Sequence, residues 1–388
     1  MDKKKNIYLI YEFLSEQGGL EREIINHARM LQEEGYEVKI LTCHFDKRIL
    51  NQLPFEGLKI ESINRFHTKI ESLNLILCFL GFNKLKKYNP VAFLSYSSPA
   101  NFLVRNKNSK KINYINHYPH YLYLNWDEKK EWAKGTQGFK RWIVVACSII
   151  FGNLLKKIDK SLIKKNDLIF MNSLFTKRKL NPIYSSFYKN EPIISYPPLD
   201  PKFSIPSNKK IKEKYIFSSS RIIPDKKYGW LIEALQYLRN KIPLYLAGSV
   251  EDSYKNELMS LAKKKGIKIK FLGRLNTNQI KEYYFNALIF AFPTPNEDFG
   301  LVPAEAMACG TPVVIWGDGA GPTEQVIDGV SGYYAKPYNL KDFANKIDLA
   351  IESKIKKKNR RKIILASKKF SYNAIKKDFI KEIKKIVL

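Results

Sequence analysis

Between residues 215 and 316, short apolar runs of strand length alternate with segments of amphipathic helical pattern, and glycines lie in the turns. Such an alternation folds as a parallel β-sheet with helices on its faces, because each crossover between parallel strands is made by a helix. We predict strands at YIFSSSR, PLYLAGS, KIKFLG, ALIFAFP and TPVVIWG, and helices at WLIEALQYL, YKNELMSLAKKKG, TNQIKEYYFNA and PAEAMACG.

The first half of the chain begins with a similar unit. A strand is predicted over residues 6–14, a helix over EREIINHARMLQEEGY and a second strand at VKILTC, with further strands at 111–117 and 167–173. A length of 388 residues suits two domains. We therefore expect an α/β protein with domains at 1–200 and 201–370, joined near the Pro-rich stretch 196–210.

The last segment, 371–388, has apolar residues at helical spacing with lysines on the other face: Ile375, Phe379, Ile380, Ile383 and Ile386. We predict a helix that packs back toward the N-terminal domain. A helix lying on a membrane surface is the alternative.

Charge restricts the possible partners. The chain has 67 Lys and Arg against 37 Asp and Glu, a formal charge of +30, which favours phosphates, acidic lipid surfaces or nucleic acid unless the lysines are merely solvated. No nucleic-acid-binding motif accompanies the charge. The four cysteines are far apart, and no apolar run is long enough to span a bilayer. Residues 1–14 resemble a strand rather than a signal peptide, so we expect a cytoplasmic protein.

The segment PNEDFGLVPAEAMACGTPVV (295–314) is the most informative. A helix starting at Pro303 would place the amides of Phe299, Gly300 and Leu301 at its N-terminus, where an anion is favoured. Glu297 and Glu305 flank that turn. The alternative is that both are surface acids beside an ordinary capped helix.

Three further segments place polar groups at the carboxyl ends of predicted strands, where α/β folds bind ligands. SSSRIIPDKKYG supplies Arg221 and Lys226, a pair suited to a pyrophosphate, although Lys227 could replace Lys226. EQGGLERE places Gly18 and Gly19 in a turn that a phosphate or sugar could approach closely. INHYPHYLY places His117 at a strand end. Each has an ordinary structural alternative: a solvated loop, a tight turn or a structural histidine.

Taken together, the order GGLER, His117, NSLFT, YPPLD, SRIIPDK and EDFGLVPAE resembles the retaining glycosyltransferases of family 4 across essentially the whole chain. That resemblance implies the GT-B fold, in which two doubly wound Rossmann-like domains face each other across a cleft. HYPHYLY followed by DLIFMNS looks like the mannosyltransferase-type branch, which builds polysaccharide or lipid-linked oligosaccharide.

The resemblance also implies roles for residues at matching positions. Arg221 and Lys226 match the Arg and Lys that bind the donor diphosphate, Glu297 the glutamate on the donor sugar and Glu305 the glutamate on the ribose. The amides of Phe299, Gly300 and Leu301 match the sugar- and phosphate-binding turn. The remaining matches are Gly273 and Arg274 beside the base, Gly18 and Gly19 facing the diphosphate, and His117 beside the reacting sugar.

The implied reaction moves a hexose, with mannose the first guess, from a nucleotide-diphosphate sugar to a lipid-linked oligosaccharide or polysaccharide acceptor, with retention at the anomeric carbon. No Asp-x-Asp is present, so we expect metal independence and no cofactor beyond the co-substrate. A catalytically silent GT-B partner or surface-binding subunit is the alternative. A binder of nucleic acid, driven by charge, is a third hypothesis.

Two apolar segments bear on where the protein acts. Residues 140–157, KRWIVVACSIIFGNLLKK, and residues 73–82, LNLILCFLGF, are too short to span a bilayer but could lie on one. Anionic lipids would attract the flanking lysines, which would make the protein peripheral on the inner face of the cell membrane. Buried helices of the N-terminal domain are the alternative.

Overall fold

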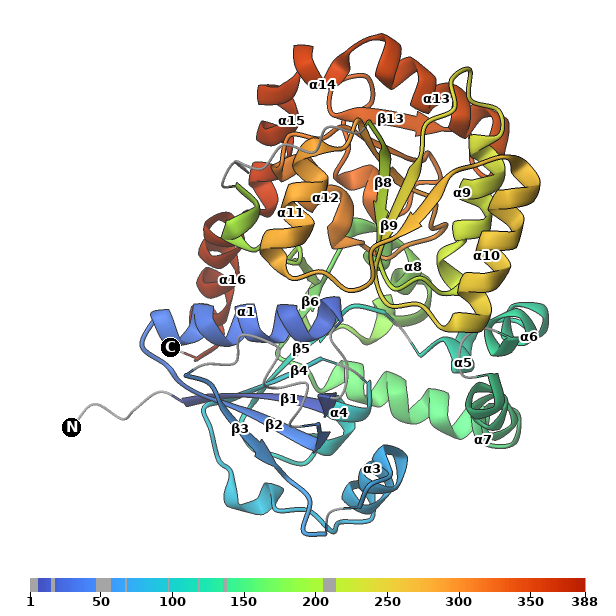
Figure 1. Cartoon of the computed structure of the whole chain (residues 1–388). Helices are drawn as coiled ribbons and strands as arrows, with labels where there is room; N and C mark the ends of the chain where they lie inside the picture. The colour runs from blue at the N-terminus through green and yellow to red at the C-terminus, as the bar shows by residue number, and fades with distance from the viewer. Residues whose placement is uncertain are drawn as a thin grey trace. The chain divides into compact units, whose positions relative to one another are not determined.

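The computed structural model describes residues 6–14, 18–46, 57–66, 68–96, 98–117, 119–134, 138–204 and 214–387. The chain divides into two compact units. Unit 1 comprises residues 1–129, 142–198 and 375–388, and unit 2 comprises residues 130–141 and 199–374. Each unit is an α/β layer structure of its own (Figure 1).

Unit 1 is built on a seven-stranded sheet in the order β3-β2-β1-β4-β5-β6-β7, and all of its strand pairs are parallel. The strands are β1 (Asn6–Leu14), β2 (Glu37–Phe45), β3 (Lys59–Ser62), β4 (Ala92–Ser95), β5 (Lys110–Ile115), β6 (Leu168–Met171) and β7 (Ile193–Ile194). Its helices include α1 (Gly19–Glu33), α3 (Glu71–Phe79), α4 (Ser98–Leu103), α5 (His120–Tyr123) and α8 (Leu174–Tyr184). Two further helices, α6 (Trp126–Lys134) and α7 (Gly138–Lys164), belong to unit 1 except for their residues within 130–141.

Unit 2 is built on a six-stranded parallel sheet in the order β10-β9-β8-β11-β12-β13. The strands are β8 (Ile216–Ser219), β9 (Leu244–Ala247), β10 (Ile269–Phe271), β11 (Ile289–Phe292), β12 (Val313–Trp316) and β13 (Gly332–Ala335). Helices α9 (Tyr228–Leu235) and α10 (Asp252–Lys265) cover one face, and α11 (Thr277–Asn286) and α12 (Leu301–Ala308) cover the other (Figure 1). Helices α13 (Leu340–Glu352), α14 (Ile355–Lys358) and α15 (Arg360–Ser367) follow the last strand.

The predicted strands are therefore present, and the predicted α/β architecture of two doubly wound sheets is confirmed. Helix α10 ends at Gly266, whose φ of 67° is the left-handed value expected of a glycine after a helix. Strands β3, β4, β7 and β13 were not predicted. They are two to four residues long, and such short runs are hard to distinguish from loops by pattern.

The C-terminal helix α16 (Tyr372–Val387) packs within unit 1 from Ile375 onward. Its apolar face is buried, and the ring of Phe379 stacks on His27 of α1 with centroids 4.2 Å apart. On its other side, Lys384 forms an ion pair with Glu34 at 2.7 Å. The apolar residues that a helix on a membrane surface would need are thus packed in the core of unit 1.

Candidate active site

The candidate site lies at the point in unit 2 where the strand order reverses. Strands β8 and β11 are neighbours, but the chain continues from β8 to β9 on one side and from β11 to β12 on the other. The loops that leave these two strands therefore diverge and leave a crevice, which is where open α/β sheets bind ligands. The loop after β8 carries Arg221 and Lys226, and the loop after β11 carries Glu297 and Gly300.

The two loops are joined by an ion pair. Lys226 Nζ lies 2.6 Å from Glu297 Oε2, and both side chains are about one-fifth exposed. Thr294 Oγ1 also donates to the carbonyl of Lys226, at 3.4 Å. A cation and a carboxylate from separate loops thus meet at the crevice, within reach of solvent.

The loop after β8 distinguishes its two lysines. Lys226 ends a short 3-10 turn and reaches Glu297. Lys227 adopts a left-handed backbone, with φ of 53°, and its ammonium lies over the ring of Trp230, 5.4 Å from the centroid. Lys226 is therefore the lysine that enters the crevice. Arg221 is exposed at the start of the same loop.

Helix α12 begins at Leu301, two residues before the predicted start at Pro303. Proline is tolerated at the third helical position, because the N–H it lacks would have no partner within the helix. The N-cap is Gly300, whose φ is 68°. A Cβ there would come within 2.9 Å of Glu297 Cγ. The amides of Gly300, Leu301 and Val302 therefore lie at the helix N-terminus, whereas Phe299, also predicted there, precedes the N-cap.

Glu305 lies on α12 and is only 3% exposed. Its Oε2 accepts a hydrogen bond from the hydroxyl of Tyr284 at 3.0 Å, and that hydroxyl lies 2.7 Å from Ser219 Oγ at the end of β8. Burial, together with the charge of Glu305, raises the pKa of Tyr284 well above 10, so Tyr284 remains a donor at neutral pH. A carboxylate held in one orientation is suited to accept hydroxyl donors of a ligand.

Residues 317–325, after β12, support the loop that bears Glu297, and sequence reasoning missed them. Gln325 Nε2 donates to the carbonyls of Phe299 and Gly300, at 2.6 and 2.8 Å. Gly321 N donates to the carbonyl of Glu297 at 2.9 Å. A Cβ on Gly321 would lie 2.2 Å from the carbonyl oxygen of Asp298. The cluster of glycines in GDGAG was the sequence signal that a backbone approaches closely here.

Gly273 and Arg274, predicted beside a nucleotide base, lie in the turn after β10, and both are exposed. The carbonyl of Gly273 accepts from the amide of Gly248, at 2.8 Å. Gly248 itself has no room for a side chain, because a Cβ would lie 1.7 Å from the carbonyl oxygen of Ser220. The turns after β8, β9 and β10 are thus fixed to one another by their backbones.

The candidate residues of unit 1 lie at the equivalent edge of its own sheet. Gly18 is the N-cap of α1, and its amide donates to Glu21 Oε2 at 2.9 Å. Gly19 is the first residue of that helix, which follows β1 at the strand-order reversal between β1 and β4. His117 is exposed and follows β5, two residues beyond the end of the strand.

A buried acid near His117 was not predicted. Glu23 of α1 is 3% exposed. Burial raises its pKa to about 8, although hydrogen bonds with Tyr114 and Asn116 act to lower it. Its neighbour His27 is fully buried, and burial lowers its pKa to about 3. Both groups are therefore largely uncharged in the interior at neutral pH. The sequence pattern of α1 does not indicate which of its polar residues are buried.

No three His, Cys, Asp or Glu side chains within the described ranges are grouped so that they could hold a metal ion. None of the helices formed by the described residues combines the length and the apolar character that crossing a bilayer requires.

Comparison with known proteins decides the family. Residues 200–370, which hold the whole site of unit 2, match the family described as Glycosyl transferases group 1. The group 1 glycosyltransferase match thus covers unit 2, and the solved structures below show the GT-B fold over the whole chain. The resemblance predicted from its motifs is confirmed.

Curated relatives match different shares of this chain. An uncharacterized glycosyltransferase of Haemophilus influenzae is 29% identical over 178 residues, which is 44% of this chain and about half (49%) of that protein. The alpha-1,3/1,6-mannosyltransferase alg-2 of Neurospora crassa is 26% identical over 402 residues, covering 89% of this chain and 82% of that protein.

Solved structures agree on the fold. The crystal structure of Anabaena HepE in complex with UDP and glucose superimposes with a TM-score of 0.74 at 17% identity, over 98% of this chain and all of that one. A glycosyltransferase from Rickettsia africae gives a TM-score of 0.74 at 19% identity, over 99% of both chains.

Proposed function

We propose that this glycosyltransferase transfers a hexose from a nucleotide-diphosphate sugar to a lipid-linked oligosaccharide or polysaccharide acceptor, with retention at the anomeric carbon. The observation that carries the proposal is the juxtaposition in unit 2 of Lys226, Glu297 and the N-terminus of α12. They place a cation, a carboxylate and backbone N–H groups at one strand-order reversal. A nucleoside diphosphate sugar needs all three kinds of partner.

Each group has a proposed role in holding the donor. Arg221 and Lys226 would neutralise the diphosphate, including the charge that develops as it leaves. Glu297 would accept hydrogen bonds from the sugar hydroxyls, and the amides of Phe299, Gly300 and Leu301 would bind the sugar and the phosphates. Donor binding would break the Lys226–Glu297 ion pair. In exchange, Lys226 would contact the diphosphate, and Glu297 would accept hydrogen bonds from the sugar hydroxyls.

Glu305 would hold the ribose hydroxyls. Its support is the pair of buried hydroxyls behind it, Tyr284 and Ser219, which fix the carboxylate before a ligand arrives. Gly273 and Arg274 would meet the base. In unit 1, Gly18 and Gly19 would serve the diphosphate, and His117 would lie beside the reacting sugar.

We propose that catalysis consists of positioning and charge stabilisation. The bond from the anomeric carbon to the diphosphate breaks as an acceptor hydroxyl attacks from the same face, and the hydroxyl proton passes to the departing phosphate. We do not assign Glu297 as a nucleophile. Its ion pair with Lys226 supports the proposal that it helps to hold the donor. Arg221 and Lys226 would supply the positive charge that a metal supplies elsewhere, so we propose metal independence.

Mannose remains our first choice of sugar. The support is the likeness to a mannosyltransferase over most of both chains. The HepE structure holds UDP and glucose, so a UDP-sugar is the alternative donor. We propose that the reaction takes place on the cytoplasmic side of a membrane, where the lipid of a lipid-linked acceptor resides.

A catalytically silent partner subunit is the second candidate. The retention of Arg221, Lys226 and Glu305 disfavours it, because a silent protein has no need for the donor-binding set. The test is release of nucleoside diphosphate and transfer of labelled sugar to a lipid extract, from a panel of GDP- and UDP-sugars with EDTA present. Turnover that is lost in Lys226→Ala supports the enzyme. Donor binding without hydrolysis or transfer would favour the silent partner.

A further inference from the structure

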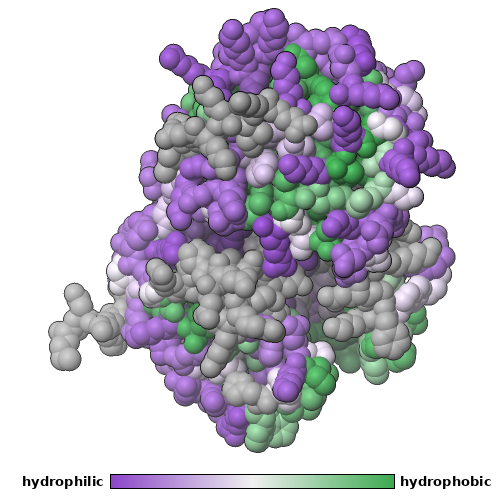
Figure 2. All heavy atoms as spheres, viewed as in Figure 1, coloured by the Kyte–Doolittle hydropathy of each residue, from purple (hydrophilic) through white to green (hydrophobic). Residues whose placement is uncertain are grey.

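Two helices of unit 1 expose their apolar side chains. On α3 and its flanks, the exposed residues are Phe66, Ile70, Leu73, Ile76, Phe79, Leu80 and Phe82, which we name the α3 patch. On α7 they are Trp142, Ile143, Ile149, Ile150, Phe151 and Leu154, which we name the α7 patch. Figure 2 shows apolar surface along the edge of unit 1 where Figure 1 places these two helices. The alternative that both segments are buried helices does not hold, because these apolar side chains are exposed.

Helix α3 buries a polar residue and leaves much of its apolar surface exposed. Its fully buried residues are Asn74 and Cys78, and Leu75 packs partly on the core, whereas Ile76 is 52% and Leu80 is 68% exposed. Asn74 is held inward by three hydrogen bonds of 2.9 Å: from its Nδ2 to His44 Nδ1 and to the carbonyl of Thr68, and from the amide of Thr68 to its Oδ1. These bonds fix the rotation of the helix, so its apolar face cannot turn toward the core.

Helix α7 is anchored in a similar way. Ser148 and Asp159 face the interior, and Asp159 accepts hydrogen bonds from the hydroxyls of Tyr123, Tyr184 and Ser98, at 2.7, 2.5 and 3.0 Å. The outward ridge is formed by Ile143, Ile150 and Leu154, which are separated by seven and four residues and so lie on one face of the helix. Water is a poor solvent for such a ridge, and contiguous apolar surfaces of this kind mark interaction sites.

Basic residues surround both patches. Residues 69–87 contain four lysines and one acid, Glu71, and residues 138–165 contain seven basic residues and one acid, the buried Asp159. Lys84, Lys86 and Lys157 are exposed. The partner should therefore present apolar material beside negative charge.

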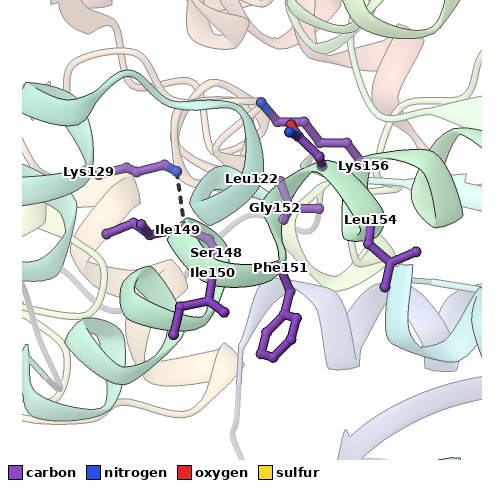
Figure 3. Close-up of a pocket in the computed structure, with 10 residues that line it drawn as sticks. Leu122, Lys129, Ser148, Ile149, Ile150, Phe151, Gly152, Leu154 and Lys156 are labelled. Atoms are coloured by element: carbon purple, nitrogen blue, oxygen red, sulfur yellow. Dashed lines mark hydrogen bonds between the residues drawn. The ribbon is translucent and has the colours of Figure 1, made fainter.

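A pocket on α7 brings Lys156 of this helix together with Lys129 of α6. Its volume is about 330 Å³, and it is lined by Leu122, Lys129, Lys156 and residues 148–154. Figure 3 shows Lys129 and Lys156 on one side of the helix, with Ile150, Phe151 and Leu154 directed to the other. Lys129 donates to Ser148 Oγ at 3.1 Å, and burial and the charge of Lys156 lower its pKa. An anion bound between the two ammonium groups would relieve this repulsion.

We propose that the α3 and α7 patches dock unit 1 on the surface of an anionic phospholipid bilayer. The apolar ridges would enter the boundary between headgroups and acyl chains, and Lys129 and Lys156 would bind a lipid phosphate at the pocket. A bilayer is favoured over a protein partner because both patches combine exposed aliphatic residues with a surplus of lysines. The proposal extends the proposed function, because a lipid-linked acceptor lies in such a surface, but it needs no nucleotide to be tested.

The experiment is co-sedimentation of the full chain with sucrose-loaded vesicles of phosphatidylglycerol and phosphatidylcholine, or of phosphatidylcholine alone. One double variant, Ile150→Glu with Leu154→Glu, alters the α7 patch, and a second, Ile76→Glu with Leu80→Glu, alters the α3 patch. The matched control is Leu365→Glu with Met259→Glu, two residues of unit 2 that are 62% and 46% exposed. All three double variants add the same negative charge, and thermal unfolding confirms that each is folded.

We expect the wild type and the control to sediment with the anionic vesicles and much less with phosphatidylcholine. Each patch variant should lose at least about tenfold in partition coefficient. Patch variants that bind as well as the wild type, or a wild type that stays in the supernatant with anionic vesicles, would overturn the proposal. A wild-type dimer in light scattering that the patch variants dissociate, without vesicle binding, would instead assign the patches to a second copy. Donor binding by the wild type is measured separately, in the absence of vesicles. A wild type that binds vesicles but no donor would contradict the proposed function alone.

Discussion

Gly321 offers a sharp test of how the donor loop is positioned. Gly321 is not itself a predicted donor ligand, but its amide donates to the carbonyl of Glu297, and a Cβ added to it would meet the backbone of Asp298 and Phe299. Alanine at this position would place a Cβ 2.2 Å from the carbonyl oxygen of Asp298 and 2.5 Å from Phe299 Cα. Both contacts are with backbone, so no flexible side chain can move aside.

The magnitude follows from these distances. Ordinary contacts begin near 3.4 Å, so the segment 297–299 must move by about 1 Å. Overpacking of this kind costs about 1–3 kcal/mol in the free energy of unfolding. A misplacement of about 1 Å in a binding loop can lower catalytic efficiency by about 10²-fold. Gly321→Ala should therefore stay folded with a lowered Tm, and lose donor affinity and kcat/KM by about that factor.

The assay is calorimetric titration of the nucleotide with Gly321→Ala, with kcat/KM measured alongside. The matched control is Gly229→Ala in α9, where the added Cβ would make an ordinary contact of 3.7 Å with Leu261. This control should unfold at the same or a slightly higher temperature, because alanine favours a helix by about 1 kcal/mol over glycine. If Gly321→Ala bound the nucleotide as tightly as the wild type, the positioning argument would be wrong.

Three further predictions concern charged groups. Glu305→Gln keeps the shape but weakens hydrogen bonds to ribose hydroxyls, so donor affinity should fall roughly 5- to 100-fold in the same titration, with little change in Tm; unchanged affinity would remove Glu305 from the site. Lys226→Ala should reduce nucleoside diphosphate affinity at least about tenfold and Lys227→Ala much less, and equal losses would contradict the distinct placement of the two lysines. Glu23 has its pKa raised to about 8 by burial, from 4.5, so the folded state keeps its proton while the unfolded state loses it. The free energy of unfolding of the wild type, measured in urea, should therefore fall relative to that of Glu23→Gln as pH rises from about 5 to 8, by at most about 5 kcal/mol. If the two free energies changed in parallel with pH, a buried protonated acid at this position would be excluded.

The fold was largely predictable because alternation of strands and helices is a local pattern. The strand predicted at ALIFAFP became β11 (Ile289–Phe292), and the helix predicted at YKNELMSLAKKKG became α10. The start of α12 was placed two residues late, because Pro303 was taken as the first helical residue, the position that proline favours. Its actual start depends on Gly300, whose left-handed backbone is set by the tertiary structure around Glu297.

The site was predictable where polar residues follow strands, and unpredictable where the support is long-range. Lys226 and Glu297 are separated by 71 residues, but both follow neighbouring strands, so the topology alone brings them together. Tyr284 and Gln325 reach the site from a helix and from a loop after the next strand. Their sequence surroundings resemble those of ordinary core or surface residues.

The exposure of the α3 and α7 patches could not be predicted from the sequence pattern. Helical periodicity shows that apolar residues share a face, but not which way that face points. The inward bonds of Asn74 and Asp159 decide the direction, and each depends on partners distant in the chain, such as His44 and Tyr184.

The most direct test of the central claim is a thermal-shift measurement on the wild type and Lys226→Ala, without metal, against UDP-, GDP-, ADP-, dTDP- and CMP-linked sugars. A donor present at about 100 times its Kd stabilises the folded state by about 2.7 kcal/mol, which gives a clear rise in Tm. The account predicts that one class of nucleoside diphosphate sugar raises the Tm of the wild type, and that this rise is lost in Lys226→Ala. A folded wild type whose Tm none of these donors changes would contradict a donor site at the strand-order reversal of unit 2.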